Sequence, residues 1–230
     1  MIKFRNWRNV FVSAWLSWFM KFLMLAMVPY EFYRGGYLFT ILILVAVGVS
    51  MVPSIVEKNY NITLPFELDL LITLSLFLHT FLGEGLEFYN KYWIWDKLLH
   101  VYGAAVTAII AFVIVYSLHY TRKLRLTLPF IVLITFTFAV TMGAMWEIGE
   151  FSVDRFFGKQ TQKGLADTMY DLINDMIGGF IVAVLGAVYV KYSRPETRHR
   201  LAKPIGEVLG IGDRVDYMKR RLKRIKKKTP

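Results

Sequence analysis

The sequence predicts an all-α fold, a polytopic membrane helix bundle of about six transmembrane helices. Apolar residues make up 56% of the 230 residues, and several apolar runs reach about 20 residues, the length that crosses ~30 Å of hydrocarbon. Basic residues gather in short loops and in the C-terminal tail, as in membrane proteins with cytoplasmic loops. We expect spans near 10–29, 36–56, 68–83, 96–118, 128–152 and 168–191.

Each expected helix has its own local signals. The first follows a basic N-terminus without a small-residue cleavage site, so we interpret it as a spanning helix rather than a signal peptide. It contains Lys21, and the third contains His79. Pro129 opens the fifth helix in its first turn, where a missing N–H does no harm. The sixth begins near Asp167, a suitable N-cap.

The distribution of Lys and Arg predicts the orientation of the helices. Basic residues precede the first helix, occupy the loop between the fourth and fifth helices, and fill the tail. With six spans these regions share one side, so we predict cytoplasmic N- and C-termini. Three basic residues in the expected outer loop run against this orientation but are outweighed: Arg155, Lys159 and Lys163.

We expect a membrane domain over residues 1–192 and a basic cytoplasmic tail over 193–230. The tail holds thirteen Lys/Arg and four Asp/Glu, and therefore most of the net charge of +11. From about Asp213 apolar residues recur at spacings of three and four, which predicts an amphipathic helix on anionic inner-leaflet lipids. A short coiled coil is the alternative. Nucleic acid is not an expected partner, and the oligomeric state is left open.

Acidic residues gather at one end of the expected spans. Nine of the seventeen Asp and Glu residues lie between positions 84 and 175, and the predicted topology places all of them at the outer ends of the third to sixth helices. A charged group in hydrocarbon costs roughly 3 kcal/mol on insertion scales, so it usually has a partner or a function. The cluster indicates a bound cation, a proton path or a metal-assisted reaction.

Helices four and five supply the first candidates. Asp96 and His100 are four residues apart and therefore neighbours on one helical face, where they would share a metal ion or form a structural pair. Glu147, Glu150 and Asp154 form a single stripe, and like charges on one stripe repel unless a cation or protons intervene. A solvated helix end is the alternative, and it suits Asp154 better than Glu147.

Helix six supplies the second group. Asp171 and Asp175 step by four along one face. The helix dipole favours acids near the N-terminus, but Asp175 lies two turns inside and precedes an apolar stretch. Gly178 follows one turn later, Gly143 lies in helix five and Gly103 in helix four. Such small residues let helices approach closely where polar groups must meet.

These patterns predict a carboxylate/His metal site. The absence of cysteine excludes thiolate ligands. Carboxylates favour Mg²⁺, Mn²⁺ or Ca²⁺, whereas an imidazole keeps Zn²⁺ or Fe²⁺ open. His100 or Glu147 would serve as general base. The expected metal ligands are Asp96, His100, Glu147, Glu150, Asp171 and Asp175.

Three sequence elements together resemble a known family. They are Trp95-Asp96-Lys97-Leu98-Leu99-His100, Trp146-Glu147-Ile148-Gly149-Glu150 and Asp167-Thr168-Met169-Tyr170-Asp171. This set resembles the YjdF-like family of small multi-pass prokaryotic membrane proteins. The Asp-Lys-x-x-His element is also similar to VanZ-like membrane proteins, some of which are linked to glycopeptide resistance. The likeness covers roughly residues 70–190 and implies a multi-pass helical membrane fold without supplying a reaction.

Three functions fit these observations. The first is a metal-dependent hydrolase or transferase that acts on lipid-linked or phosphorylated substrates. The second is a carrier coupled to protons or divalent cations, although the runs 104–115 and 128–145 contain no charged residue. The third is a non-catalytic scaffold or resistance factor, whose polar cluster only fixes the helix bundle.

Overall fold

The structure is a computed structural model that describes residues 7–121 and 123–211. The described residues form helices and no strand, which confirms the predicted all-α class. Six helices are long and apolar enough to cross a membrane, as predicted, and most extend beyond the expected bounds. These spans are Val12–Tyr33, Tyr37–Tyr60, Pro65–Gly85, Trp95–Tyr120, Leu128–Phe157 and Leu165–Tyr192. The chain divides into two compact units, residues 1–99 and 100–230.

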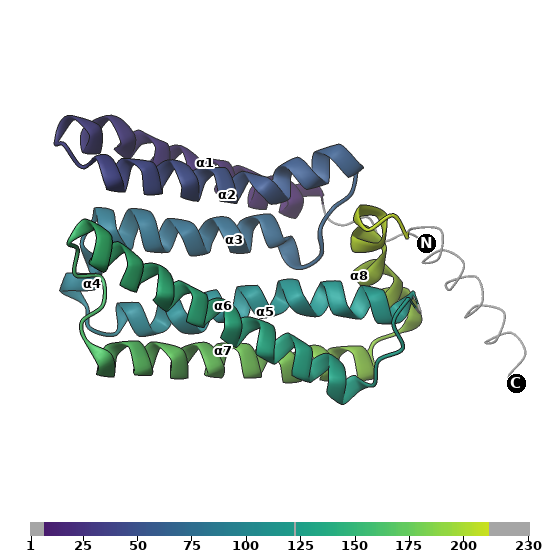
Figure 1. Cartoon of the computed structure of the whole chain (residues 1–230). Helices are drawn as coiled ribbons and strands as arrows, with labels where there is room; N and C mark the ends of the chain where they lie inside the picture. Colours follow the sequence, from purple (N-terminus) through teal and green to yellow (C-terminus); the bar gives the residue numbers. More distant parts are fainter. Residues whose placement is uncertain (1–6, 122, 212–230) are drawn as a thin grey trace, which may run out of the picture. The chain divides into compact units, whose positions relative to one another are not determined.

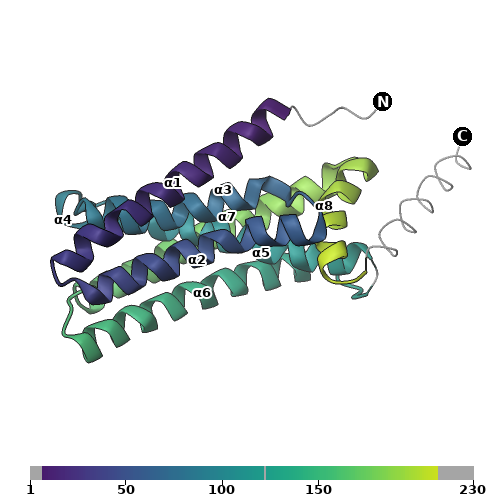
Figure 2. The ribbon, with the colours of Figure 1, turned by 90° about the horizontal axis from the view of Figure 1, so that it is seen from above.

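The first unit is built on three helices that pack against one another: α1 (Trp7–Tyr33), α2 (Tyr37–Tyr60) and α3 (Leu68–Phe77) (Figure 1). A single 3₁₀ turn, η1 (Pro65–Glu67), leads into α3, and a π-helical segment, η2 (Leu78–Gly85), continues it. The short helix α4 (Phe88–Lys91) follows. Figure 2 shows α1 diverging from its neighbours toward its N-terminal end.

An ion pair between a buried lysine and a half-buried aspartate lies among these three helices. Lys21 of α1 is only 1% exposed, and its Nζ lies 3.0 Å from Asp69 Oδ1 of α3. Ser54 of α2 accepts a hydrogen bond from Lys21 and donates one to the same Asp69 oxygen. We call these residues the Lys21–Asp69 cluster. The sequence places Lys21 inside an apolar helix, but its partner is a tertiary contact that helical periodicity does not reveal.

His79 also has a packed, hydrogen-bonded environment. It lies in η2, and its Nδ1 is 2.6 Å from the hydroxyl of Tyr89 in α4. Gly83, one turn further along η2, leaves the space that the Tyr89 ring fills, because a Cβ there would overlap the ring. His79 therefore holds α4 against the end of the third span through this hydrogen bond.

The second unit contains α5 (Trp95–Tyr120) from His100 onward, α6 (Leu128–Phe157), α7 (Leu165–Tyr192) and α8 (Pro195–Val208). Pro129 lies in the first turn of α6 as predicted, and Gly158 ends that helix in the left-handed conformation. α7 begins at Leu165, so the N-cap is Gly164 and the prediction of Asp167 as N-cap is wrong. Asp167 lies in the first turn and accepts a hydrogen bond from the Lys163 N–H.

Small residues allow the helices of the second unit to approach closely. A Cβ on Gly178 would overlap the main-chain carbonyl of Val101 in α5, and one on Gly179 would crowd the Ala139 side chain in α6. α7 therefore lies directly against both α5 and α6, and Figure 1 shows α6 and α7 as neighbours. This confirms the expected close approach at Gly178, while the role of Gly103 stays a prediction.

Apolar side chains cover the outside of the spanning helices. Trp15 and Phe22 of α1 are 64% and 65% exposed, and Phe180 and Leu185 of α7 are 57% and 60% exposed. In contrast, Lys21, Glu147, Asp171 and Asp175 are buried. Lipid chains would cover the exposed apolar surface, since hydrocarbon solvates these side chains as well as a protein interior does.

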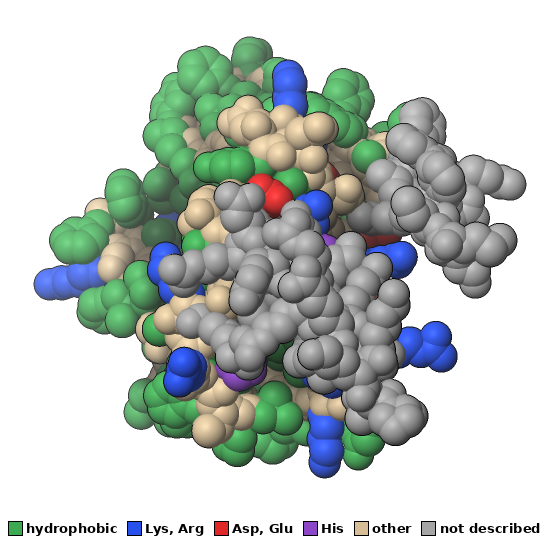
Figure 3. All heavy atoms as spheres, turned by 90° about the vertical axis from the view of Figure 1, so that its right-hand side faces the viewer, with side chains coloured by type: hydrophobic (Ala, Val, Ile, Leu, Met, Phe, Trp, Pro, Cys, Tyr) green, Lys and Arg blue, Asp and Glu red, His purple; other side chains and the backbone are tan. Residues whose placement is uncertain are grey.

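The predicted tail contains one helix that the sequence reasoning missed. α8 begins with Pro195 in its first turn and buries His199, Leu201 and Ile205. Figure 3 views the end that carries α8, where Lys and Arg side chains stand out among apolar ones. The predicted amphipathic helix from about Asp213 lies outside the described residues. The domain boundary at 192 and the orientation of the termini stay predictions.

Candidate metal centre

His100 lies at the centre of a group of buried carboxylates from two other helices. It belongs to α5 and is 8% exposed. Its Nε2 is 3.6 Å from Glu147 Oε1 of α6 and 3.9 Å from Asp171 Oδ1 of α7. Its Nδ1 is 3.2 Å from Asp175 Oδ1, one turn further along α7. We call these four residues the carboxylate–histidine cluster.

The cluster is enclosed by the packing of its helices. Glu147, Asp171 and Asp175 are 5%, 2% and 3% exposed. Gly143 of α6 leaves the space that Asp175 fills, because a Cβ there would overlap the Asp175 carboxylate. Together with the contact of Gly178 against Val101, which follows His100 directly, this glycine lets carboxylates from both helices reach the imidazole.

The distances on the Nε2 side are those of two ligands around one ion. A charge-assisted N–H···O bond is about 2.7–2.9 Å long, so separations of 3.6 and 3.9 Å are too long for direct bonds. Two atoms that each lie about 2.1 Å from a common metal ion are separated by at most about 4.2 Å. His100, Asp171 and Asp96 each offer one ligand atom, and these three atoms lie within 4.8 Å of one another, close enough to hold one metal ion.

Asp175 plays a different part on the other side of the ring. Both of its oxygens lie within hydrogen-bond distance of Nδ1, at 3.2 and 3.3 Å. A carboxylate that accepts a hydrogen bond from one imidazole N–H fixes the tautomer and aims the other nitrogen at a metal ion. The donor set on the Nε2 side, one imidazole and two carboxylates, suits a divalent cation.

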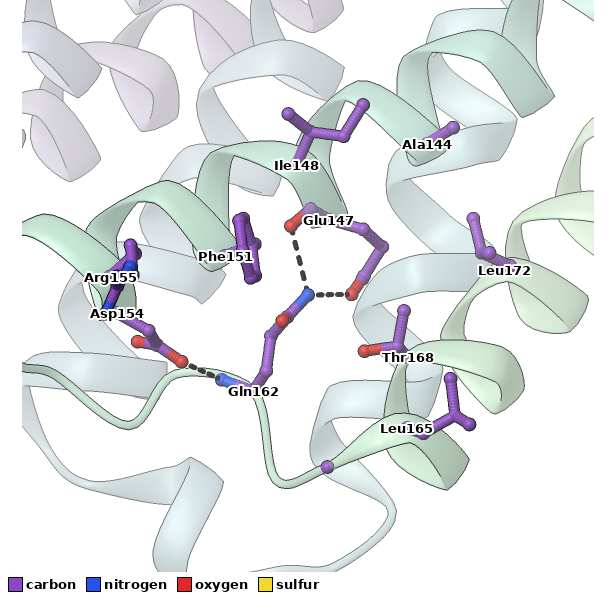
Figure 4. A pocket seen from close by; sticks show the side chains of 11 residues that line it. Ala144, Glu147, Ile148, Phe151, Asp154, Arg155, Gln162, Leu165, Thr168 and Leu172 are labelled. Atoms are coloured by element: carbon purple, nitrogen blue, oxygen red, sulfur yellow. Dashed lines mark hydrogen bonds between the residues drawn. The ribbon is translucent and has the colours of Figure 1, made fainter.

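Gln162 determines which oxygen of Glu147 faces His100. Its Nε2 donates to Glu147 Oε2 at 3.0 Å and to the Glu147 main-chain oxygen at 3.0 Å (Figure 4). Glu147 Oε1 is buried and has no hydrogen-bond partner. A buried carboxylate oxygen without a partner is costly, and a cation bound between Oε1 and Nε2 would remove that cost.

Asp154 holds the loop that carries Gln162. One of its oxygens accepts from the main chain and the hydroxyl of Thr161, each at 2.7 Å, and the other accepts from the Gln162 N–H at 3.0 Å. The predicted stripe on α6 thus has two functions, with Glu147 in the cluster and Asp154 supporting the loop. The sequence gives no signal for the bond of Gln162 to Glu147, since no helical spacing relates the two.

The remaining predicted ligands lie one helical turn away from members of the cluster. Asp96 precedes His100 by one turn of α5, offers an oxygen within 4.8 Å of a His100 ring nitrogen, and lies 3.3 Å from Lys97 Nζ. Glu150 follows Glu147 by one turn of α6, where its main-chain oxygen accepts a hydrogen bond from Thr161. Of the six predicted ligands, Glu147, Asp171 and Asp175 contact the imidazole of His100. Asp96 lies within 4.8 Å of the ligand atoms of His100 and Asp171, whereas Glu150 is not part of this group.

Residues 15–192 match a family described as "Predicted membrane protein (DUF2238)". The chain belongs to the DUF2238 family. The chain is also 40% identical over 136 residues to a Thermotoga maritima protein described as an uncharacterized protein, and this alignment covers 57% of this chain and 67% of that relative. No solved structure matches the chain. The family match and the six apolar helices make this DUF2238 chain a multi-pass protein of the prokaryotic cell membrane.

Proposed function

We propose that this DUF2238 protein binds a divalent metal ion in the carboxylate–histidine cluster. His100 Nε2, Glu147 Oε1 and Asp171 Oδ1 are the proposed ligands, and Asp175 orients the ring through Nδ1. The observation that carries the proposal is Glu147 Oε1, a buried oxygen without a hydrogen bond that faces an imidazole nitrogen at 3.6 Å. Asp96 and Glu150, one turn away, remain candidates for a further ligand position.

The donor set leaves room for chemistry at the ion. Three protein ligands with an open position are typical of catalytic rather than structural metal sites. An ion there would activate a water molecule or hold a phosphate oxygen. We therefore propose hydrolysis or group transfer on lipid-linked or phosphorylated substrates. In this proposal His100 and Glu147 bind the metal ion rather than act as the predicted general base. Carboxylates lie beside both ring nitrogens of His100.

Transport coupled to protons or divalent cations is the alternative function. A path across the membrane needs polar groups along its length, and the runs 104–115 of α5 and 128–145 of α6 contain no charged residue. This pattern favours a one-sided reaction site. Flux of H⁺, Mg²⁺ or Mn²⁺ into liposomes that hold the purified protein would instead support the carrier.

Metal content tests the proposal directly. The full chain, purified in detergent and titrated with Mn²⁺ or Zn²⁺, should bind one ion per chain, and Asp171→Asn should abolish binding at micromolar metal. Asp167→Asn is the matched control, because Asp167 lies one turn earlier on α7 and bonds to the Lys163 N–H. Wild-type protein without stoichiometric metal would overturn the proposal and leave a purely structural role for the cluster.

The resemblances stated from the sequence bear on this proposal to different degrees. The YjdF-like set of motifs lies within the region matched by the DUF2238 family. It contains three of the four cluster residues, His100, Glu147 and Asp171. The likeness to VanZ-like proteins depends on Asp96-Lys97-x-x-His100 alone. A role as a resistance factor therefore stays a prediction from that single element.

A further inference from the structure

A pocket opens beside the carboxylate–histidine cluster, between the C-terminal end of α6, the first turns of α7 and the loop that joins them (Figure 4). Its volume is about 680 Å³, within the range of about 300–1,000 Å³ that is typical of small-molecule sites. Glu147 belongs both to the pocket wall and to the cluster. A ligand in the pocket would therefore have one end beside the proposed metal ion.

The walls of the pocket have two kinds of surface. Ile148 and Phe151 of α6 are 64% and 59% exposed, and Leu165 of α7 is 79% exposed. Their helices are candidate membrane spans, so these side chains would meet lipid chains. Figure 4 shows Gln162 and Thr168 in the middle of the pocket, around Glu147. One apolar and one polar region in a single pocket suit an amphiphile rather than a wholly polar molecule.

The charges around the pocket favour an anionic head group. Arg155 lines it, and Lys159 and Lys163 are exposed on the adjoining loop. The oxygens of the neighbouring Asp154 accept hydrogen bonds from Thr161 and Gln162. This carboxylate is therefore bonded to the loop. A phosphate oxygen is a good acceptor for a guanidinium and a good ligand for a divalent cation.

We propose that this pocket binds a membrane lipid with a phosphate head group. The phosphate lies between Arg155 and the cluster, and the acyl chain runs along Ile148, Phe151 and Leu165. The proposal deepens the proposed function and rests on it in part, because the bound cation supplies the second positive charge for the phosphate. It assigns the lipid class on which the metal site would act.

Direct binding measurements test the lipid class. The full-length protein, delipidated in a fixed concentration of detergent, is titrated with phosphatidic acid, with diacylglycerol of the same chains, and with inorganic phosphate. We expect one phosphatidic acid per chain, bound at least tenfold more tightly than either of the other two. If diacylglycerol binds as tightly as phosphatidic acid, the pocket does not recognise the phosphate. If inorganic phosphate binds as tightly, the pocket does not recognise the acyl chains.

Two variants locate the binding site. Ala144→Phe fills the pocket from α6 and should weaken phosphatidic acid binding at least tenfold, whereas Leu133→Phe, exposed on the same helix outside the pocket, should not. Arg155→Gln should weaken phosphatidic acid binding severalfold, and Arg155→Lys should retain most of the wild-type affinity. Unchanged binding by Ala144→Phe, with the fold verified by its melting temperature, would overturn the assignment of the pocket.

Metal content of the same samples separates the two proposals. Ala144→Phe should keep one divalent ion per chain, because Ala144 is not a proposed ligand. If the wild type holds no metal but still prefers phosphatidic acid in a manner sensitive to Ala144→Phe, the metal site fails and the lipid pocket stands. If metal binds and phosphatidic acid shows no preference, the lipid pocket fails and the metal site stands.

Discussion

The Lys21–Asp69 cluster and the carboxylate–histidine cluster both bury charged groups within candidate membrane spans, but they differ in charge balance. In the first, one ammonium meets one carboxylate at 3.0 Å and Ser54 bonds to both. In the second, three buried carboxylates surround one imidazole, which carries at most one positive charge. The first cluster pairs one positive with one negative charge, whereas in the second the carboxylates outnumber the imidazole.

This difference shows which buried acids mark a ligand site. A sequence scan for acidic residues in apolar helices selects Asp69 and Asp171 alike, because each costs several kcal/mol when it is charged in hydrocarbon. Only the tertiary partners separate them: Asp69 has Lys21, while Asp171 faces His100 together with Glu147. Several carboxylates around one imidazole are therefore a better criterion for metal binding than one acid in an apolar helix.

The largest expected effect is the loss of the neutral pair. Lys21→Met leaves Asp69 without its ammonium, and removal of one partner from a buried ion pair costs about 3–5 kcal/mol. Equilibrium unfolding in mixed detergent should show a loss of this size in the free energy of unfolding. Metal binding by the folded fraction should stay unchanged, because the change lies in the first unit.

A double variant checks that the charge causes this loss. Lys21→Met combined with Asp69→Leu removes both charges, and apolar replacements of a buried ion pair are often neutral or stabilising. We therefore expect the double variant to recover most of the stability that the single variant loses. If the double variant is as unstable as Lys21→Met, the packing of the Lys21 side chain accounts for the loss instead of its charge.

The second effect concerns the orientation of the imidazole. Asp175→Asn replaces the carboxylate at Nδ1 by an amide, and loss of such an orienting partner weakens metal affinity about 10–100-fold in known sites. A competition titration with a chromogenic chelator measures the dissociation constant. Asn174→Ala, next to it on α7, is the control. An unchanged dissociation constant for Asp175→Asn would mean that Asp175 does not orient His100 for the metal.

The sequence predicts the helices better than it predicts their contacts. Long apolar runs define the six spans because hydrocarbon thickness sets their length, and the 3.6-residue period places Asp171 and Asp175 on one face of α7. Gly143 and Gly178 correctly indicate close packing. The bond of Gln162 to Glu147 and the pairing of Lys21 with Asp69 join distant segments, and a single sequence carries no periodic signal for them.

In the carboxylate–histidine cluster, removal of one charge should raise the free energy of unfolding, whereas in the Lys21–Asp69 cluster it should lower it. Like charges in one buried cluster repel, and partial protonation relieves part of this repulsion. Glu147→Gln should therefore raise the free energy of unfolding of the metal-free protein by roughly 1–2 kcal/mol. Unfolding in the presence of EDTA measures this gain.

The same substitution separates the metal site from a structural polar cluster. With saturating Mn²⁺ or Zn²⁺, wild-type protein should gain stability and Glu147→Gln should gain much less, because a ligand that binds only the folded state stabilises it in proportion to its affinity. Glu150→Gln, one turn further along α6, is the matched control and should follow the wild type. A loss of stability on Glu147→Gln in EDTA would show that the carboxylate is already balanced by protein groups, as Asp69 is by Lys21, and the contrast between the two clusters would disappear.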